Sequence, residues 1–125
     1  MTKLERLEAA NGLLRTIASC GRGFFRHGDD VGYFELDEKG RVWYVDSYTQ
    51  IPIYTHYAGR WKAFSQGGTM RSLVIGLRDF IRSGDQLHPE TLGPWPDYIC
   101  GGDLWGYGDD MERVRERALQ EGIIA

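Results

Sequence analysis

The sequence predicts an α+β fold in which an antiparallel meander leads into an amphipathic helix. Three observations indicate this class: aromatic and β-branched runs broken by glycine between residues 31 and 64, an apolar helical stripe between 69 and 82, and helix-start patterns near both ends. Strand and helix periodicities in separate segments are typical of α+β proteins. A chain of 125 residues has the length of one domain. We therefore expect a single domain over residues 1–125, organised around the meander and its helix.

The N-terminal segment predicts a helix over residues 3–19. Thr2 and Glu5 have the spacing of a capping box, in which each side chain accepts a hydrogen bond from the other residue's backbone N–H. Leucines and isoleucines follow near helical spacing. The segment 20–23, which contains two glycines, ends the pattern.

The segments 31–37 and 41–46 predict a β-hairpin. Gly40 allows the positive φ that a three-residue loop closed by a bulge requires. Pairing Asp37 with Arg41 sets the register of the strands. The expected partners are then Tyr33 with Val45, Phe34 with Tyr44, Glu35 with Trp43, and Leu36 with Val42.

A third strand is expected over residues 51–57, and a short fourth strand over 60–64 would complete the meander. This register places Trp43, His56 and Trp61 side by side on one face, with Tyr54 diagonal to them. A slip of one residue in the second turn would exchange the faces, so the register stays open, as does the choice between three and four strands. The face toward the core would carry Phe34, Leu36, Val42, Tyr44, Ile53 and Phe64.

Two further helices are predicted. Thr69 is a suitable N-cap for the first, and Gly84 ends it. Asp109 or Asp110 caps the second, which ends at Gly122. The apolar residues expected to face the core are Met70, Leu73, Val74, Leu77, Phe80 and Ile81 in the first helix, and Met111, Val114, Ala118 and Leu119 in the second.

The segment 85–108 predicts a long, ordered loop rich in glycine and tryptophan. Loops of this length in compact domains are usually functional or packed by their own side chains. Two interpretations stay open: Trp95 and Trp105 either cover the open side of the sheet or form a binding surface. For the second, we select Trp95, Asp103, Trp105 and Tyr107, because aromatic anchors dominate interface energetics.

Composition is typical of a soluble globular protein, with 42% apolar and 26% charged residues. No apolar run reaches the length of a membrane span, and no secretory signal precedes the first helix, so we expect a cytoplasmic protein. Cys20 and Cys100 lack zinc or redox spacing and are expected to be reduced and buried rather than bridged.

The net charge of −3 is divided unevenly along the chain. Residues 1–78 hold eleven basic and eight acidic residues and are therefore +3, whereas residues 79–125 hold four and ten and are −6. This division indicates opposed charged faces. The overall negative charge does not favour general affinity for nucleic acid.

No residue pattern predicts catalysis, a cofactor or a metal. The histidines at positions 27, 56 and 88 lack metal-ligand spacing, and Gly67-Gly68-Thr69 lacks the lysine of a P-loop. His56 beside two tryptophans favours a packed sheet residue over a catalytic base. We expect neither catalytic residues nor cofactors.

Five stretches of the chain carry a resemblance to known proteins: residues 10–18, 40–49, 53–57, 67–69 and 101–108. In these stretches the chain resembles small proteins encoded by tailed bacteriophages and prophages. The resemblance implies a bacterial cytoplasm during infection and assigns no activity to any residue. By analogy, small phage proteins of this size often bind host machines, including CRISPR effectors.

Three hypotheses about function follow. The leading one is a non-enzymatic binding protein that inhibits a host defence complex and recognises a protein or ribonucleoprotein with a basic surface. The second is a nucleic-acid-binding protein, and the third is an enzyme of an unrecognised class. No membrane partner is expected, and the oligomeric state stays open, with a dimer among the alternatives. The second hypothesis uses Trp43, Tyr54 and Trp61 for stacking and Arg41, Arg60 and Lys62 for phosphates.

Overall fold

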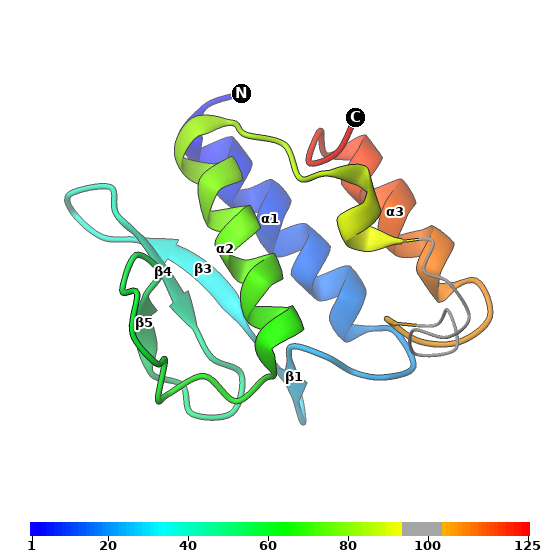
Figure 1. The fold of residues 1–125 in the computed structure, drawn as a ribbon, viewed down its shortest axis with the longest axis horizontal. Helices are drawn as coiled ribbons and strands as arrows, with labels where there is room; N and C mark the ends of the chain where they lie inside the picture. The colour runs from blue at the N-terminus through cyan, green and yellow to red at the C-terminus, as the bar shows by residue number, and fades with distance from the viewer. Residues whose placement is uncertain (94–103) are drawn as a thin grey trace.

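The computed structural model describes residues 1–93 and 104–125, and these residues form an α+β fold, as predicted (Figure 1). Two small antiparallel sheets lie beside a layer of helices. The elements in chain order are α1 (Lys3–Ala18), β1 (Arg26–His27), β2 (Asp30–Val31), β3 (Tyr33–Leu36), β4 (Val42–Val45), β5 (Pro52–Tyr54), α2 (Gly68–Ser83), the 3₁₀ helix η1 (Pro89–Leu92) and α3 (Asp110–Gln120).

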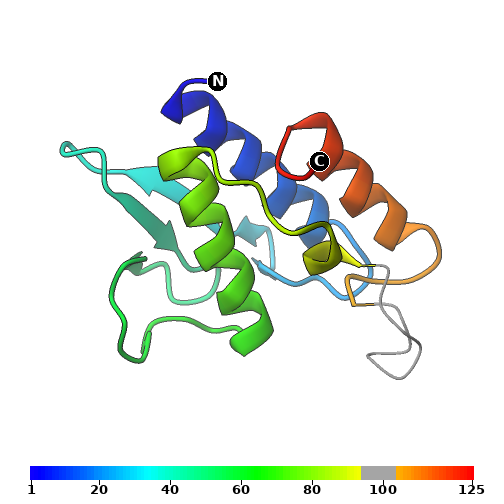
Figure 2. The same ribbon diagram turned by 45° about the horizontal axis from the view of Figure 1, so that its top comes forward.

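Helix α1 is the central element of the fold. It contacts α2, α3 and β3, while α2 also packs on β4, and the two ribbon views show α1 between the other long helices (Figures 1 and 2). The predicted capping box is present, with Glu5 N donating to Thr2 Oγ1 and Thr2 N donating to Glu5 Oε1. The meander and α2 pack on each other as expected, and α1 adds contacts with α2, α3 and β3.

The three-stranded sheet has the order β3-β4-β5. All four predicted partner pairs between β3 and β4 are confirmed, and Gly40 has the expected positive φ of +75°. Strand β5 is shorter than predicted, and its register places Tyr54 opposite Trp43 and Ile53 opposite Tyr44. His56 is therefore displaced from Trp43 by two residues, a shift that leaves each side chain on its predicted face.

The predicted strand over residues 60–64 is wrong. This segment forms turns, in which Phe64 N donates to Trp61 O, and Trp61 is buried. A short hairpin that the sequence did not predict joins Arg26–His27 to Asp30–Val31.

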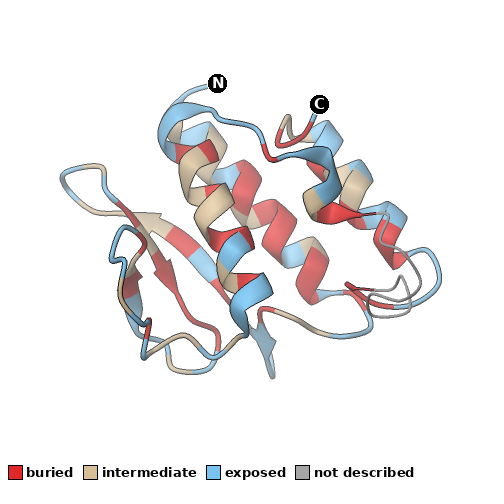
Figure 3. Cartoon of the chain, viewed as in Figure 1, coloured by how far each residue is buried: buried red, intermediate tan, exposed pale blue. Residues whose placement is uncertain are grey.

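The core lies between the helices and the inner face of the sheet (Figure 3). All six apolar residues predicted for α2 are buried, and Gly84 ends the helix with φ +77°. Helix α2 begins two residues earlier than predicted, so Gly67 and not Thr69 is its N-cap. In α3, Leu119 is 52% exposed and does not join the core as expected.

The outer edge of β3 is bonded to a side chain of α1. Asn11 Nδ2 donates to Phe34 O at 3.0 Å, and Phe34 N donates to Asn11 Oδ1 at 2.7 Å. One amide side chain thus occupies both backbone groups that Phe34 directs away from the sheet.

Candidate functional site

The predicted loop surface is not assembled by the described residues. Trp105 is 1% exposed, packs edge-on against Phe24 at 6.4 Å between ring centroids, and donates from Nε1 to Leu92 O. Its placement in the core corrects its selection as an interface anchor. Tyr107 is exposed, whereas Trp95 and Asp103 lie outside the described residues.

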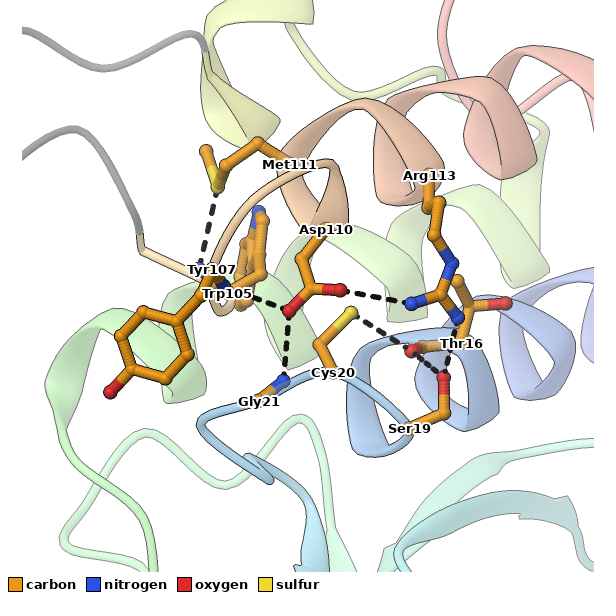
Figure 4. A network of polar contacts seen from close by, with 9 residues as sticks. All are labelled: Thr16, Ser19, Cys20, Gly21, Trp105, Tyr107, Asp110, Met111 and Arg113. Carbon is orange, nitrogen blue, oxygen red and sulfur yellow. Dashed lines mark hydrogen bonds and ion pairs between the residues drawn. The ribbon is translucent and has the colours of Figure 1, made fainter.

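The network around Asp110 holds this region to the end of α1 (Figure 4). Asp110 Oδ2 accepts hydrogen bonds from Gly21 N at 2.9 Å and Tyr107 N at 2.8 Å, and Oδ1 accepts one from Arg113 Nη1 at 2.9 Å. The backbone donors of Gly21 and Tyr107, followed by Arg113, hold the pKa of this carboxyl below its usual value. Asp110 therefore joins α1 to α3, a structural role that the sequence assigned only to helix capping.

Cys20 lies beside this network as a free, buried thiol, and its Sγ donates to Thr16 O. Burial, followed by the nearby Asp110 carboxylate, raises the pKa of the thiol, which favours an inert residue. The expectation of a reduced, buried cysteine is confirmed for Cys20, and Cys100 lies outside the described residues.

The outer face of the sheet brings together two of the predicted stacking residues. Trp43 and Tyr54 are cross-strand partners with ring centroids 5.3 Å apart, and the Arg41 guanidinium lies 5.6 Å from the Tyr54 ring. Both rings are partly exposed. Asp37 fixes this arrangement, because it accepts bonds from Trp43 Nε1 at 2.9 Å and Arg41 Nε at 2.7 Å.

The pKa of Asp37 follows from these contacts. Desolvation raises it, but the bonds from Trp43 and Arg41, with a further one from Lys39 N, lower it far more, so that the carboxylate stays charged. The charged carboxylate thus accepts hydrogen bonds from both the Trp43 indole and the Arg41 guanidinium.

Trp61 does not join this face. It is buried, donates from Nε1 to Tyr57 O, and lies under the Arg71 guanidinium at 4.4 Å. The expectation that Trp61 is a stacking residue beside Trp43 and His56 is corrected, because the turn at 57–64 directs the indole into the core. A groove along β5 nevertheless brings Trp61 together with Tyr54 and with the predicted phosphate contacts Arg60 and Lys62.

A basic pocket of about 380 Å³ lies at the β3–β4 turn. Three elements supply its cations: the start of α1, the turn itself and the end of α2. Lys3 Nζ donates to Gly40 O, which ties α1 to the turn. Of these cations only Arg41 was predicted to bind a ligand, and nothing in the sequence indicates that Lys3 and Arg82 lie beside it, because they are about 40 residues away in the chain. The pocket is lined by Lys3, Lys39, Gly40, Arg41, Val42, Tyr54, His56 and Arg82.

His56 lines the basic pocket, and its pKa is affected by nearby cations. Its 5.9 Å ring contact is with Tyr54 and not with Trp43. Desolvation, followed by the positive charges of Arg78 and Arg82, lowers the pKa of His56. The imidazole is therefore biased toward its neutral form.

Two classes of site find no support in the described part of the chain. Among residues 1–93 and 104–125, no group of three or more His, Cys, Asp or Glu side chains could hold a metal ion. Within the same residues, no helix is both long enough and apolar enough to cross a membrane.

The fold and its surface define a small α+β domain with a basic, aromatic sheet end. Comparison with protein families then places the chain: it matches the YoqU family over residues 1–125 and belongs to that family. Neither curated proteins nor solved structures gave a match.

Proposed function

We propose that this protein is a non-enzymatic accessory protein of a phage or prophage that acts in the bacterial cytoplasm and binds single-stranded nucleic acid at its basic pocket. The observation that carries the proposal is the position of the pocket beside the Trp43–Tyr54 ring pair. Single-strand binding sites combine cations that follow the backbone with aromatic rings on which bases stack.

The cations and the aromatic rings would have different roles in binding. Lys39, Arg41 and Arg82 are exposed and would neutralise phosphates, while the partly exposed faces of Trp43 and Tyr54 would receive bases. Because Asp37 already holds the Trp43 indole, little side-chain entropy is lost on binding. The negative net charge acts at longer range and is screened at physiological salt.

A fluorescence anisotropy titration with a labelled oligonucleotide at several salt concentrations tests the proposal. The double variant K39Q/R82Q removes two cations of the pocket and is expected to reduce the slope of log affinity against log salt by about 1.4. The matched control is R15Q, because exposed Arg15 lies at the other end of α1 from Lys3, about 18 Å along the helix. Equal binding by K39Q/R82Q and the wild type would refute the proposal.

Inhibition of a host defence complex, such as a CRISPR effector, is the second candidate. It is supported by the exposure of Tyr107 beside Asp109 in the acidic half of the chain, a pairing suited to a basic partner. A pull-down from bacterial lysate with wild-type protein and Y107A tests it: a partner captured only by the wild type supports inhibition through this surface, and equal capture by both contradicts it.

A further inference from the structure

A second cavity lies at the opposite end of β4 from the basic pocket. Strand β4 begins next to Arg41 and ends at Val45, and Ser47 follows in the wall of this cavity. The volume is about 510 Å³, within the range of small-molecule sites. The lining has no carboxylate and includes Arg26, His27, Ser47, Tyr48, Lys62 and Phe64.

Three chain segments form the cavity, and the buried Asp46 carboxylate holds two of them together. Its Oδ2 accepts from Tyr48 N and Thr49 N at 2.9 and 3.0 Å, and its Oδ1 accepts from Ser65 N and Oγ at 2.8 and 3.0 Å. Thr49 Oγ1 adds a bond to Ala63 O. Four donors compensate the Asp46 charge, so this wall is rigid and does not present a bare anion to a ligand.

Both turns that border the cavity contain strained backbone. In the described part of the chain, the non-glycine residues with positive φ are Phe25, at +64°, and Gln50, at +58°. Phe25 directly precedes Arg26, and Gln50 closes the turn that begins at Ser47. Left-handed conformations of bulky residues are rare and cluster at binding sites.

The hydroxyl of Ser47 lies behind the cavity wall. Ser47 is 1% exposed and its residue is part of the lining, but its Oγ is buried and has no hydrogen-bond partner among the described residues. Because this oxygen has almost no accessible surface, it does not bond to a ligand in the cavity. The Tyr44 hydroxyl, also without a partner, packs over Gly32 and is not in the cavity wall.

The cavity lining also contains cations and aromatic rings. Arg26 and Lys62 are exposed cations, and neither forms a salt bridge with another described residue. His27 and Tyr48 meet edge to face at 4.7 Å between centroids, and Tyr48 is 63% exposed. Asp29 and Asp30 lie nearby on the β1–β2 hairpin but outside the lining.

We propose that this cavity binds a mononucleotide. Arg26 and Lys62 would bind the phosphate, and the Tyr48 and His27 rings would contact the base. Two cations alone could bind any anion. The adjoining aromatic rings favour an anion that also carries a planar ring, because such a ring can pack against them. This site is separate from the basic pocket and does not depend on the function proposed above.

Calorimetric titration with AMP, adenosine and inorganic phosphate tests the site, together with amide chemical shifts. We expect AMP to shift the amides of Arg26, Ser47 and Tyr48, and to bind at least about tenfold more tightly than adenosine or phosphate. Phosphate binding as tightly as AMP would overturn the role of the rings and the assignment to a nucleotide. Absence of shifts at these amides would overturn the site.

Variants separate this site from the basic pocket. R26Q/K62Q is expected to weaken AMP binding at least about tenfold, whereas K39Q/R82Q leaves it unchanged. Unchanged AMP affinity in R26Q/K62Q, or loss in K39Q/R82Q, would contradict the proposal.

Discussion

The role of an individual residue in this protein depends on its burial more than on its residue type. Trp43 and Trp105 look alike in the sequence, yet the first is a partly exposed member of a ring pair and the second is 1% exposed. The glycines and prolines around Trp105 indicate an ordered loop, but they do not indicate whether the tryptophan ring is buried or exposed. The strand alternation around Trp43 does reveal it, because adjacent residues face opposite sides of a sheet.

Truncation of Trp105 tests its structural role. W105A removes a large ring from the core and is expected to lower the free energy of unfolding by about 3–5 kcal/mol. Urea denaturation followed by circular dichroism measures the change, with Y107A as the exposed aromatic control. A stable W105A protein that loses a binding partner would instead restore Trp105 to an interface.

The Asp110 network predicts a pH-dependent stability. The folded state lowers the pKa of Asp110 below its ordinary value of 3.8, so the folded state holds the proton less tightly than the unfolded state. The stabilisation is complete above the unfolded pKa and is lost as pH falls through the folded pKa. D110N should be less stable than wild type at pH 7, and the difference should shrink below pH 4, as measured by urea unfolding across this range. A difference that is constant with pH would contradict the charged network.

At the scale of elements, local signals were sufficient wherever the chain has regular periodicity. The capping box of α1, the β3–β4 register and the inner face of α2 all follow from residues close in sequence. The register of β5 does not, because the turn before it depends on the buried Asp46 carboxylate and on Gln50 in a left-handed conformation. The basic pocket does not follow from local signals either, because it forms only where the start of α1 and the end of α2 meet the β3–β4 turn.

The junction between α1 and α3 should tolerate no added methyl group. A Cβ at Gly106 would lie 1.9 Å from Asp110 Oδ2 and 2.7 Å from Gly21 N, a backbone atom, whereas a Cβ at Gly68 would meet nothing within 4 Å. G106A is therefore expected to cost about 1–3 kcal/mol of stability, and G68A, in the first turn of α2, should keep or raise it. Thermal unfolding of both variants measures this, and equal melting temperatures would contradict the close packing at Gly106.

At the scale of the whole molecule, two cavities lie at opposite ends of one sheet. The basic pocket lies where β3 turns into β4, and the second cavity lies beyond the end of β4. Neither was evident in the sequence, since each draws side chains from segments more than 20 residues apart. The division of charge along the chain accounts for only part of the basic pocket, because Lys3, Lys39 and Arg41 come from the basic segment 1–78 but Arg82 comes from the acidic segment 79–125.

Asn11 has a consequence for the behaviour of the protein at high concentration. A free strand edge is a template on which another chain can add, and such addition leads to aggregation. At β3 the Asn11 amide already occupies the outward N–H and C=O of Phe34. At the other edge, β5 has only three residues, starts with Pro52, which has no N–H, and has its Tyr54 carbonyl bonded to Tyr57 N.

N11A would therefore do more than remove two hydrogen bonds. We expect a loss of about 1–3 kcal/mol in unfolding free energy and, at the same time, growth of particle size with concentration in light scattering, because the β3 edge becomes available to a second copy. R15A, on the same helix, should stay at the size of the wild type. If N11A also stays at that size, the edge is protected by other means. The Asn11 side chain thus occupies the place where a further strand would otherwise pair.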